Sequence, residues 1–299
     1  MERYKLRSIK KDKDILVTLL IYGVPGLVLL VLFQLLPIFT AFEYSFFKIN
    51  LMNDTKKFLG LQNYINAFTD TDFLHSLWIT FKYFLMRVPI QMVCGFLLAL
   101  LIARPHAWTG ALRTVILIPV ITSMVVATSI LGLMFHPSNG LINSMLQMVG
   151  IPPQGFLTDS RQALGTLAFI TIWKNAGLTM LFFLAGLLSI SDSIYEAAEI
   201  DGASSFQKHF YVTIPMLKPT IAFVFLTTTI RSFQVFGPVL LTTAGGPAGA
   251  TKVAVMSIYE NAFTYNQVGY ASTQSIILAA ILIAISAIQN RLKKRGGAK

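Results

Sequence analysis

The chain has 299 residues, of which 55% are hydrophobic and only 12% are charged, and its mean hydropathy is +0.66. Soluble proteins contain about 25% charged residues, so this composition excludes a soluble globular domain as well as a disordered chain. The net charge is +11. The single cysteine, Cys94, excludes an intramolecular disulfide, and the four separated histidines form no metal-binding pattern.

Long uncharged apolar runs predict membrane-spanning helices, because about 20 apolar residues are needed to cross the hydrocarbon core. The first run, residues 15–42, is too long for the ~7–15-residue core of a signal peptide. Six spans are predicted, at about residues 15–38, 77–103, 114–135, 163–190, 219–242 and 271–290. Lipid offers backbone groups no partners, so each span is expected to be a helix. The prediction is an all-α polytopic membrane protein.

The distribution of basic residues predicts the orientation of the six transmembrane helices. The tails at residues 1–14 and 291–299, with the loops after the second and fourth spans, hold fifteen Lys and Arg residues. The segments on the other side hold five. The positive-inside rule therefore places both termini in the cytoplasm, with the transmembrane domain at residues 15–290 between two basic tails. Topology explains the basic excess, so the lipid bilayer is the expected partner and no nucleic acid is needed.

All thirteen acidic residues lie outside the predicted spans. Proton- and sodium-driven carriers usually need an intramembrane carboxylate, although backbone carbonyls can also coordinate sodium. The sequence contains no potassium-filter motif and no clustered catalytic set. A stand-alone secondary carrier or channel is thus the alternative from another functional class, and a membrane enzyme is disfavoured.

Two basic residues, Lys174 and Arg231, each lie about twelve residues into a predicted span. A charge near the bilayer centre costs roughly 2.5–3.5 kcal/mol on insertion scales, so both side chains should face the bundle interior or a watery cavity. One interpretation is a cavity for the solute, favouring an anionic one. The alternatives are hydrogen bonds to carbonyls or hydroxyls, or a counter-charge from a partner chain. Residues three or four positions away share their helix faces, namely Thr171, Leu178, Thr228, Gln234 and Val235. Asn175, next to Lys174 and four residues after Thr171, is grouped with them. We assign no function to Lys82 or Arg87 from the sequence.

The predicted cytoplasmic loop at residues 191–218 carries clear helix signals. Ser193 followed by Glu196 has the spacing of a capping box, and Gly202 marks a helix end. A second short helix is expected from Ser204 to about Tyr211, before Pro215. The product is an amphipathic helix on the cytoplasmic face, which is either a docking element or an ordinary interfacial helix.

This loop resembles the EAA loop of ABC-importer permeases. The matching residues are Glu196-Ala197-Ala198, Asp201-Gly202-Ala203, Ile214-Pro215 and Leu217. The segments 232–236, 243–247, 250–251 and 269–272 are similar to carbohydrate-uptake permeases of the maltose/glycerol-phosphate type, in particular to the first-subunit half of their heterodimers. Ser232 opens the first of these segments. Gly237 departs from the pattern, because many relatives carry Asp there.

The resemblance implies a non-catalytic permease subunit in a bacterial cytoplasmic membrane. Its implied partners are a homologous second permease, a cytoplasmic ABC ATPase dimer and an extracytoplasmic solute-binding protein. The EAA residues named above would couple to the ATPase, while Thr171, Lys174, Asn175, Leu178, Thr228, Arg231, Ser232, Gln234 and Val235 would line the substrate pathway. This chain would bind no cofactor or metal, since ATP and magnesium are used by the ATPase. The expected solute is an oligosaccharide, including acidic ones, with a phosphorylated glycerol compound as the alternative.

Overall fold

The computed structural model describes residues 19–50, 55–103 and 108–296. The chain forms two compact units, one made of Met1–Phe68 with Asn261–Ile276 and the other of Thr69–Glu260 with Ile277–Lys299. The predicted basic tails at 1–14 and, in part, 291–299 lie outside the described residues.

The first unit begins with one long apolar helix, Leu20–Tyr44. It contains the α-helices α2 (Val24–Leu30) and α3 (Leu36–Tyr44) and the π-helical segments η1 (Leu19–Gly23) and η2 (Val31–Leu35). Each π-helical segment ends shortly before a proline, Pro25 or Pro37. A proline has no N–H and its ring crowds the preceding turn, which explains the wider turns there. Its large apolar side chains are mostly exposed, as suits a helix surrounded by lipid.

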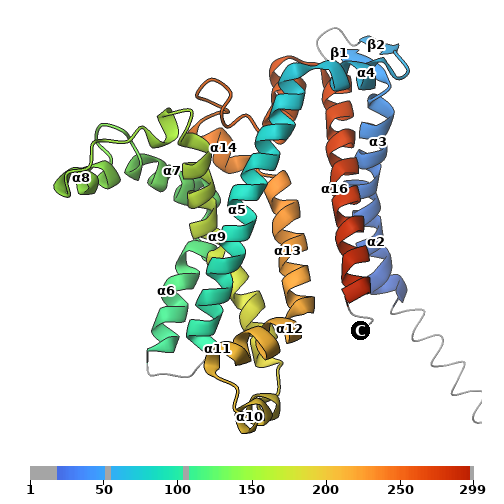
Figure 1. Cartoon of the computed structure of the whole chain (residues 1–299). Coiled ribbons are helices and arrows are strands. Elements are labelled where there is room, and N and C mark those ends of the chain that lie inside the picture. The colour runs from blue at the N-terminus through green and yellow to red at the C-terminus, as the bar shows by residue number, and fades with distance from the viewer. Residues whose placement is uncertain (1–18, 51–54, 104–107, 297–299) are drawn as a thin grey trace, which may run out of the picture. The chain divides into compact units, whose positions relative to one another are not determined.

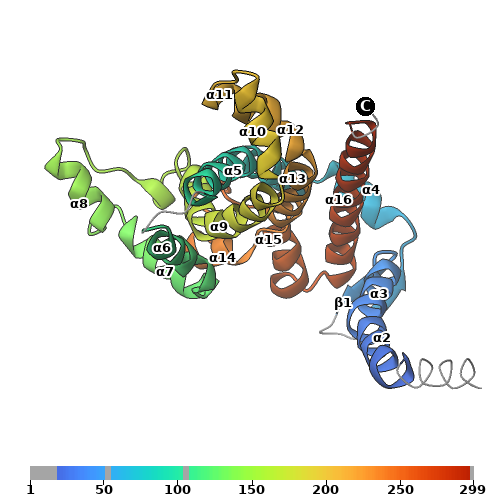
Figure 2. The same ribbon diagram turned by 90° about the horizontal axis from the view of Figure 1, so that it is seen from below.

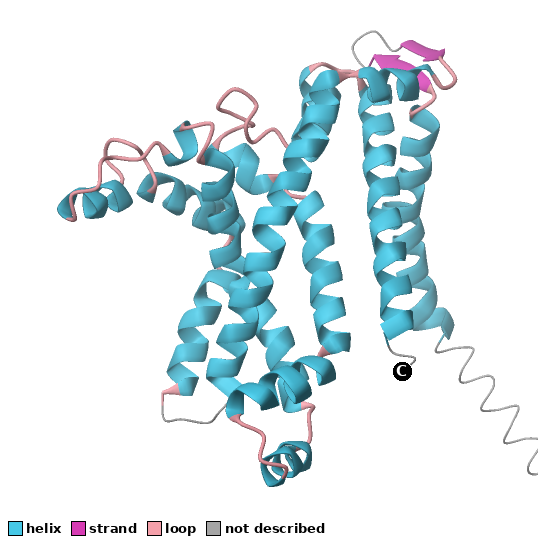
Figure 3. Ribbon diagram, viewed as in Figure 1, coloured by secondary structure: helices cyan, strands magenta, loops and turns pink. Residues whose placement is uncertain are grey.

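A short hairpin follows this helix, formed by β1 (Phe47–Asn50) and β2 (Thr55–Phe58) as an antiparallel pair with Phe47 opposite Phe58. Figure 3 shows these two strands as the exception in an otherwise helical structure. The next helix is α4 (Gln62–Thr69). The buried Asn63 amide donates to the carbonyl oxygens of Ser45 and Phe47 at 2.9 and 3.0 Å, which fixes the turn before the hairpin.

The core of the second unit is a pair of long helices, α5 (Thr71–Ala103) and α9 (Ala163–Leu188). They are flanked by α6 (Thr109–Ile121) and α13 (Lys218–Phe233), as seen along the bundle in Figure 2. Glycines allow the close contacts: a Cβ at Gly177 would lie 2.5 Å from the carbonyl oxygen of Ile116, and a Cβ at Gly95 would overlap Thr179.

Short helices lie at both ends of this bundle (Figure 1). At one end are α10 (Asp192–Ile200), α11 (Ser205–Lys208), η4 (His209–Thr213) and α12 (Ile214–Met216); at the other end are α7 (Met124–Met134), α8 (Leu141–Met148), η3 (Phe156–Thr158) and α14 (Gly237–Thr242). The remaining elements are α15 (Ala254–Tyr259), η5 (Glu260–Thr264) and α16 (Val268–Gly296).

Among the described residues, four helices are long and apolar enough to cross a membrane, and two bent helix pairs raise the number to as many as six. The four are Leu20–Tyr44, Thr71–Ala103, Ala163–Leu188 and Val268–Arg291. The all-helical, multi-span fold expected from the sequence is therefore confirmed, with the small hairpin as an addition. The predicted limits of the spans within the bilayer stay predictions.

Two of the predicted spans are not continuous helices, contrary to their uniform apolar sequence. The span predicted at 114–135 is divided into α6 and α7, which meet at 98°. Thr122 and Ser123 adopt extended ψ angles of 143° and 140° between them. The helix expected to continue to residue 242 ends at Phe233 and resumes at Gly237. Each break needs new partners for the freed carbonyl groups, and hydropathy does not reveal such partners.

Candidate functional site

A cavity of about 270 Å³ lies in the second unit where α13 ends and α14 begins. Side chains from α5, α7 and α9 complete its wall. Its lining residues are Arg87, Met124, Thr171, Asn175, Arg231, Gln234, Val235, Phe236, Gly237 and Pro238. The break in the fifth predicted span thus forms part of the cavity wall.

Five of the nine predicted pathway residues meet at this cavity. They are Thr171, Asn175, Arg231, Gln234 and Val235. The other four, Lys174, Leu178, Thr228 and Ser232, are not among its described lining residues. Thr228 and Ser232 are buried in the packing of α13, and the Ser232 hydroxyl has no hydrogen-bond partner among the described residues. Their pathway roles stay predictions.

Lys174 lies at the break between α6 and α7. Its ammonium nitrogen donates to the carbonyl oxygens of Pro119 at 2.9 Å and Val120 at 3.2 Å. These two carbonyls belong to the last turn of α6, which has no intrahelical donors for them. A cation at the negative end of a helix dipole is also electrostatically favourable. The structure therefore gives Lys174 the carbonyl-bonding arrangement that the sequence left as an alternative.

Arg87 likewise donates a hydrogen bond to a backbone carbonyl group, here near the end of α13. Only 4% of this residue is exposed, and its Nη1 donates to the carbonyl oxygen of Arg231 at 3.4 Å. Its Nε donates to Oε1 of Gln91 at 3.0 Å, one turn further along α5. The sequence analysis assigned Arg87 no function. A charged side chain within a span was the available signal, but helix packing was needed to show which cavity it faces.

A chain of hydrogen bonds holds the cavity wall together. The amide of Gln91 donates to Oγ1 of Thr179 at 2.9 Å, which links α5 to α9. About two turns earlier on both helices, the hydroxyls of Tyr83 and Thr171 lie 2.7 Å apart. Tyr83 is fully buried. Because these bonds join the two central helices on both sides of Arg87, the position of its guanidinium is well defined.

The predicted coupling helix is present as α10. The N–H of Gly202 donates to the Glu199 carbonyl at 3.0 Å, and that of Ala203 donates to the Ala198 carbonyl at 2.9 Å. This is the Schellman arrangement, and it needs a left-handed residue after the helix. Gly202 supplies it with a φ of +77°. The helix end predicted at Gly202 is therefore confirmed.

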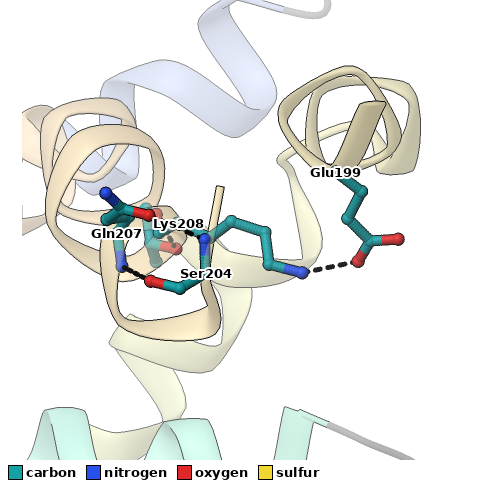
Figure 4. A network of polar contacts seen from close by, with 5 residues as sticks. Glu199, Ser204, Gln207 and Lys208 are labelled. Carbon is teal, nitrogen blue, oxygen red and sulfur yellow. Dashed lines mark hydrogen bonds and ion pairs between the residues drawn. The ribbon is translucent and has the colours of Figure 1, made fainter. Parts of the chain in front are cut away.

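The start of α10 differs from the prediction. The helix begins at Asp192 with Ser191 as its N-cap, so Ser193 lies inside the first turn and does not form the expected capping box. A capping box is found instead at α11, where Ser204 Oγ accepts from the N–H of Gln207 and Gln207 Oε1 accepts from the N–H of Ser204 (Figure 4). The motif alone did not identify the right serine, because two Ser-x-x-Glu/Gln sequences lie within fifteen residues.

One ion pair joins α10 to α11. Lys208 Nζ lies 2.5 Å from Oε1 of Glu199, across the turn that contains Gly202 (Figure 4). Tyr195 adds a second link, because its hydroxyl lies 3.1 Å from Oγ1 of Thr213. The exposed face of this segment carries Glu196 and large apolar side chains, including Ile200, which is 87% exposed, and Tyr211, which is 79% exposed.

The other predicted coupling residues lie on or next to the same segment. Ala197 and Ala198 are on α10, Asp201 is its C-cap, and Ala203 follows the glycine. Ile214 and Pro215 are helical in α12, and the chain bends at Leu217 by 67° rather than at the proline. Among the described residues, no group of three or more His, Cys, Asp or Glu side chains could hold a metal ion.

Comparison with known proteins identifies the family. Residues 91–295 match the family described as "Binding-protein-dependent transport system inner membrane component". The chain is 31% identical over 280 residues to the probable ABC transporter permease protein YurN of Bacillus subtilis, covering 92% of this chain and 96% of that protein. It is 34% identical over 275 residues to the lactose transport system permease protein LacF of Rhizobium radiobacter, covering 90% and 91% of the two chains.

A third relative is the sn-glycerol-3-phosphate transport system permease protein UgpA of Brucella suis. It is 32% identical over 272 residues, which cover 91% of this chain and 92% of that protein. Among solved structures, the chain resembles a bacterial ABC transporter involved in the import of the acidic polysaccharide alginate. The TM-score is 0.83 at 23% identity, covering 96% of this chain and 99% of that one. This likeness shows a shared fold.

The family match spans more than half of the chain, and it includes α10 and all the described cavity-lining residues except Arg87. The relatives align over nearly their whole length. The chain therefore belongs to the binding-protein-dependent transport system inner membrane components, and it is a multi-pass permease subunit of an ABC importer of the carbohydrate-uptake type.

Proposed function

We propose that this chain pairs with a homologous permease to form the membrane pathway of a sugar importer. In this proposal an ATPase dimer docks on α10 from the cytoplasm, and a solute-binding protein delivers the solute from the other side. ATP and magnesium are used by the ATPase, and this chain binds neither. Dependence on a binding protein is a property of the family itself.

One observation carries the proposal: α10 follows α9 directly and leads to α13 through α11, η4 and α12, and residues of both α9 and α13 line the cavity. A displacement of α10 would therefore be transmitted to the cavity wall by two helices at once. The Glu199–Lys208 ion pair and the Tyr195–Thr213 contact stiffen the segment that would transmit it. Glu196 and the exposed apolar side chains provide a surface for the ATPase.

The proposed solute is an oligosaccharide. The relatives include transport permeases named for lactose and for trehalose/maltose. A phosphorylated glycerol compound is the second candidate, because another relative is named for sn-glycerol-3-phosphate. A hydrogen-bonding cavity with Thr171, Asn175 and Gln234 suits polyhydroxylated solutes of both kinds.

The test is uptake by the complete complex in proteoliposomes with ATP on the ATPase side, with and without a solute-loaded binding protein. A panel of neutral sugars, acidic sugars and glycerol phosphates would be compared by the accumulated solute and the ATP hydrolysed. We expect uptake only when ATP, ATPase and binding protein are all present. Uptake by this chain and its permease partner alone would instead indicate a secondary carrier or channel.

A further inference from the structure

We infer that Arg87 and Arg231 together bind an oxyanion group of the transported solute, so that this permease carries an anionic substrate. The inference rests on the proposed function, because it assumes that the cavity is part of the solute pathway. The group recognised is a carboxylate of an acidic sugar or a phosphate ester of glycerol, which present the same chemistry to guanidinium groups.

The first argument is charge balance. Arg87 and Arg231 come from different helices and line the same cavity of about 270 Å³. None of the described residues lining that cavity is acidic. The three ion pairs found in the described part of the chain involve other residues. Burying a cation away from water is costly unless an opposite charge or good hydrogen bonds compensate it. An anionic solute would provide an opposite charge for the buried Arg87 and would also attract Arg231 across the same cavity.

The second argument is the number of donors that Arg87 has to offer. A guanidinium carries five N–H donors. One bonds to Gln91 and one to the carbonyl of Arg231. The Tyr83 hydroxyl also interacts with this group, which lies 5.9 Å from the Tyr83 ring centre. Even with Tyr83 counted as an acceptor, two of the five donors have no acceptor among the residues that the structure describes. A carboxylate or phosphate can accept two parallel N–H bonds from one arginine.

The third argument is that Arg87 is held in position before any solute arrives. Gln91 is bonded to Arg87 through its oxygen and to Thr179 through its nitrogen, so neither end of the amide is free to turn. Binding to a fixed donor set avoids the entropy cost of ordering a long side chain. Arg231 is exposed by contrast, which allows it to close over an anion that Arg87 anchors.

The fourth argument is the position of α7. This 11-residue helix begins at Met124, which lines the cavity, and its N-cap Ser123 makes no side-chain cap bond. The first N–H groups of a helix lack acceptors within the helix and carry a partial positive charge. Broken membrane helices present such ends to anionic groups of transported solutes. The helix end therefore adds to the positive potential of the two arginines.

The size of the cavity limits what is recognised. Pockets that enclose small ligands measure about 300–1,000 Å³, and this one is slightly smaller. It therefore fits one charged residue of an oligosaccharide, or a small phosphate ester, rather than a whole oligosaccharide. Recognition would act on one charged group at a time as the solute passes.

The experiment measures uptake by the complete complex at saturating concentrations of loaded binding protein. The variants are Arg87→Gln, Arg87→Lys and Gly237→Asp, with Lys82→Gln as the control. Lys82 is on the same helix but outside the cavity, with its ammonium 5.3 Å from the Trp78 ring centre. A Cβ at Gly237 would meet no atom within 4 Å, and Gly237 lines the cavity, so this position has room for an added carboxylate. The solutes are uronate oligosaccharides, glycerol phosphate and matching neutral compounds.

We expect uptake of the anionic solute to fall at least tenfold in Arg87→Gln, to fall less in Arg87→Lys, and to stay unchanged in Lys82→Gln. Gly237→Asp should also reduce it, because its carboxylate would compete for the same guanidinium groups. If Arg87→Gln does not assemble, Gly237→Asp still decides the question. Comparing the uptake of uronate oligosaccharides with the uptake of glycerol phosphate shows whether the recognised group is a carboxylate or a phosphate.

Two other results would overturn the inference. Uptake of the anionic solute unchanged in both Arg87→Gln and Gly237→Asp would show that the arginines do not bind it. ATP-dependent uptake of neutral sugars alone would reject the inference while leaving the proposed function intact. If neither sugars nor glycerol phosphates were taken up by an assembled, ATP-hydrolysing complex, the proposed function would fail and the inference with it.

Discussion

The ammonium nitrogen of Lys174 lies 2.9 Å from the carbonyl oxygen of Pro119, although 55 residues separate the two in the chain. This bond places the positive charge of α9 at the carboxyl end of α6, where the third predicted span breaks. A charge that looks like a substrate ligand in the sequence thus has a structural partner. The break and the lysine depend on one another, since each would otherwise leave polar groups unsatisfied.

Replacing Lys174 with Met is expected to destabilise the folded chain by about 1–3 kcal/mol, because a buried and a half-buried carbonyl group would lose their donor. Lys174→Arg should keep part of the stability, since an arginine can also donate to both carbonyls. Thermal unfolding of the detergent-solubilised complex measures the effect, and Lys82→Met is the control for loss of a lysine. An unchanged melting temperature combined with lost uptake would assign Lys174 to the solute pathway instead.

Gly177→Ala is expected to destabilise the α6–α9 contact by about 1–3 kcal/mol, the usual cost of overpacking. The added Cβ would lie 2.5 Å from the Ile116 carbonyl oxygen and 2.9 Å from Cγ2 of Val120, and the backbone atom cannot turn away. Gly165→Ala on the same helix has open space and should be neutral or slightly stabilising. The two melting temperatures provide the comparison, and equal values would mean that α6 shifts freely.

Gly202→Ala is expected to reduce the solute transported per ATP hydrolysed. An alanine at a φ of +77° costs about 1–2 kcal/mol, which would loosen the turn between α10 and α11. Gly150→Ala is a closely matched control, because Gly150 has the same φ and equally open surroundings but lies after α8. Both variants should lose similar stability, while only Gly202→Ala should uncouple. Uncoupling in both, or in neither, would contradict the role given to α10.

Charge reversal tests the ion pair between α10 and α11. Glu199→Lys and Lys208→Glu should each lower the coupling ratio, and the double variant should restore it. Effects on stability should stay below about 1 kcal/mol, because the Glu199 side chain is 62% exposed. The exposed pair Lys56–Glu43 in the other unit is the control, and its reversal should leave coupling unchanged. A double variant as uncoupled as the single ones would show that the pair does not transmit motion.

The sequence by itself determined that this chain is a membrane protein and to which family it belongs, and it predicts the orientation, with both termini in the cytoplasm. These properties depend on composition and on local patterns: apolar runs long enough to span lipid, the asymmetry of Lys and Arg, and the EAA residues around Gly202. The end of α10 was predictable for the same reason, since a Schellman turn depends on neighbouring residues and on one glycine with positive φ.

Only the tertiary structure decided which intramembrane cation faces the cavity. The sequence made Lys174 and Arg231 equally good candidates for lining a cavity, and it suggested no role for Arg87. Helical periodicity shows which residues share a helix face, but it does not show which other helix or cavity that face contacts. Packing of α5, α6 and α9 turned Lys174 toward carbonyl groups and brought Arg87 to Arg231. The breaks at Thr122 and after Phe233 were hidden for the same reason: the donors that satisfy their carbonyls lie many residues away.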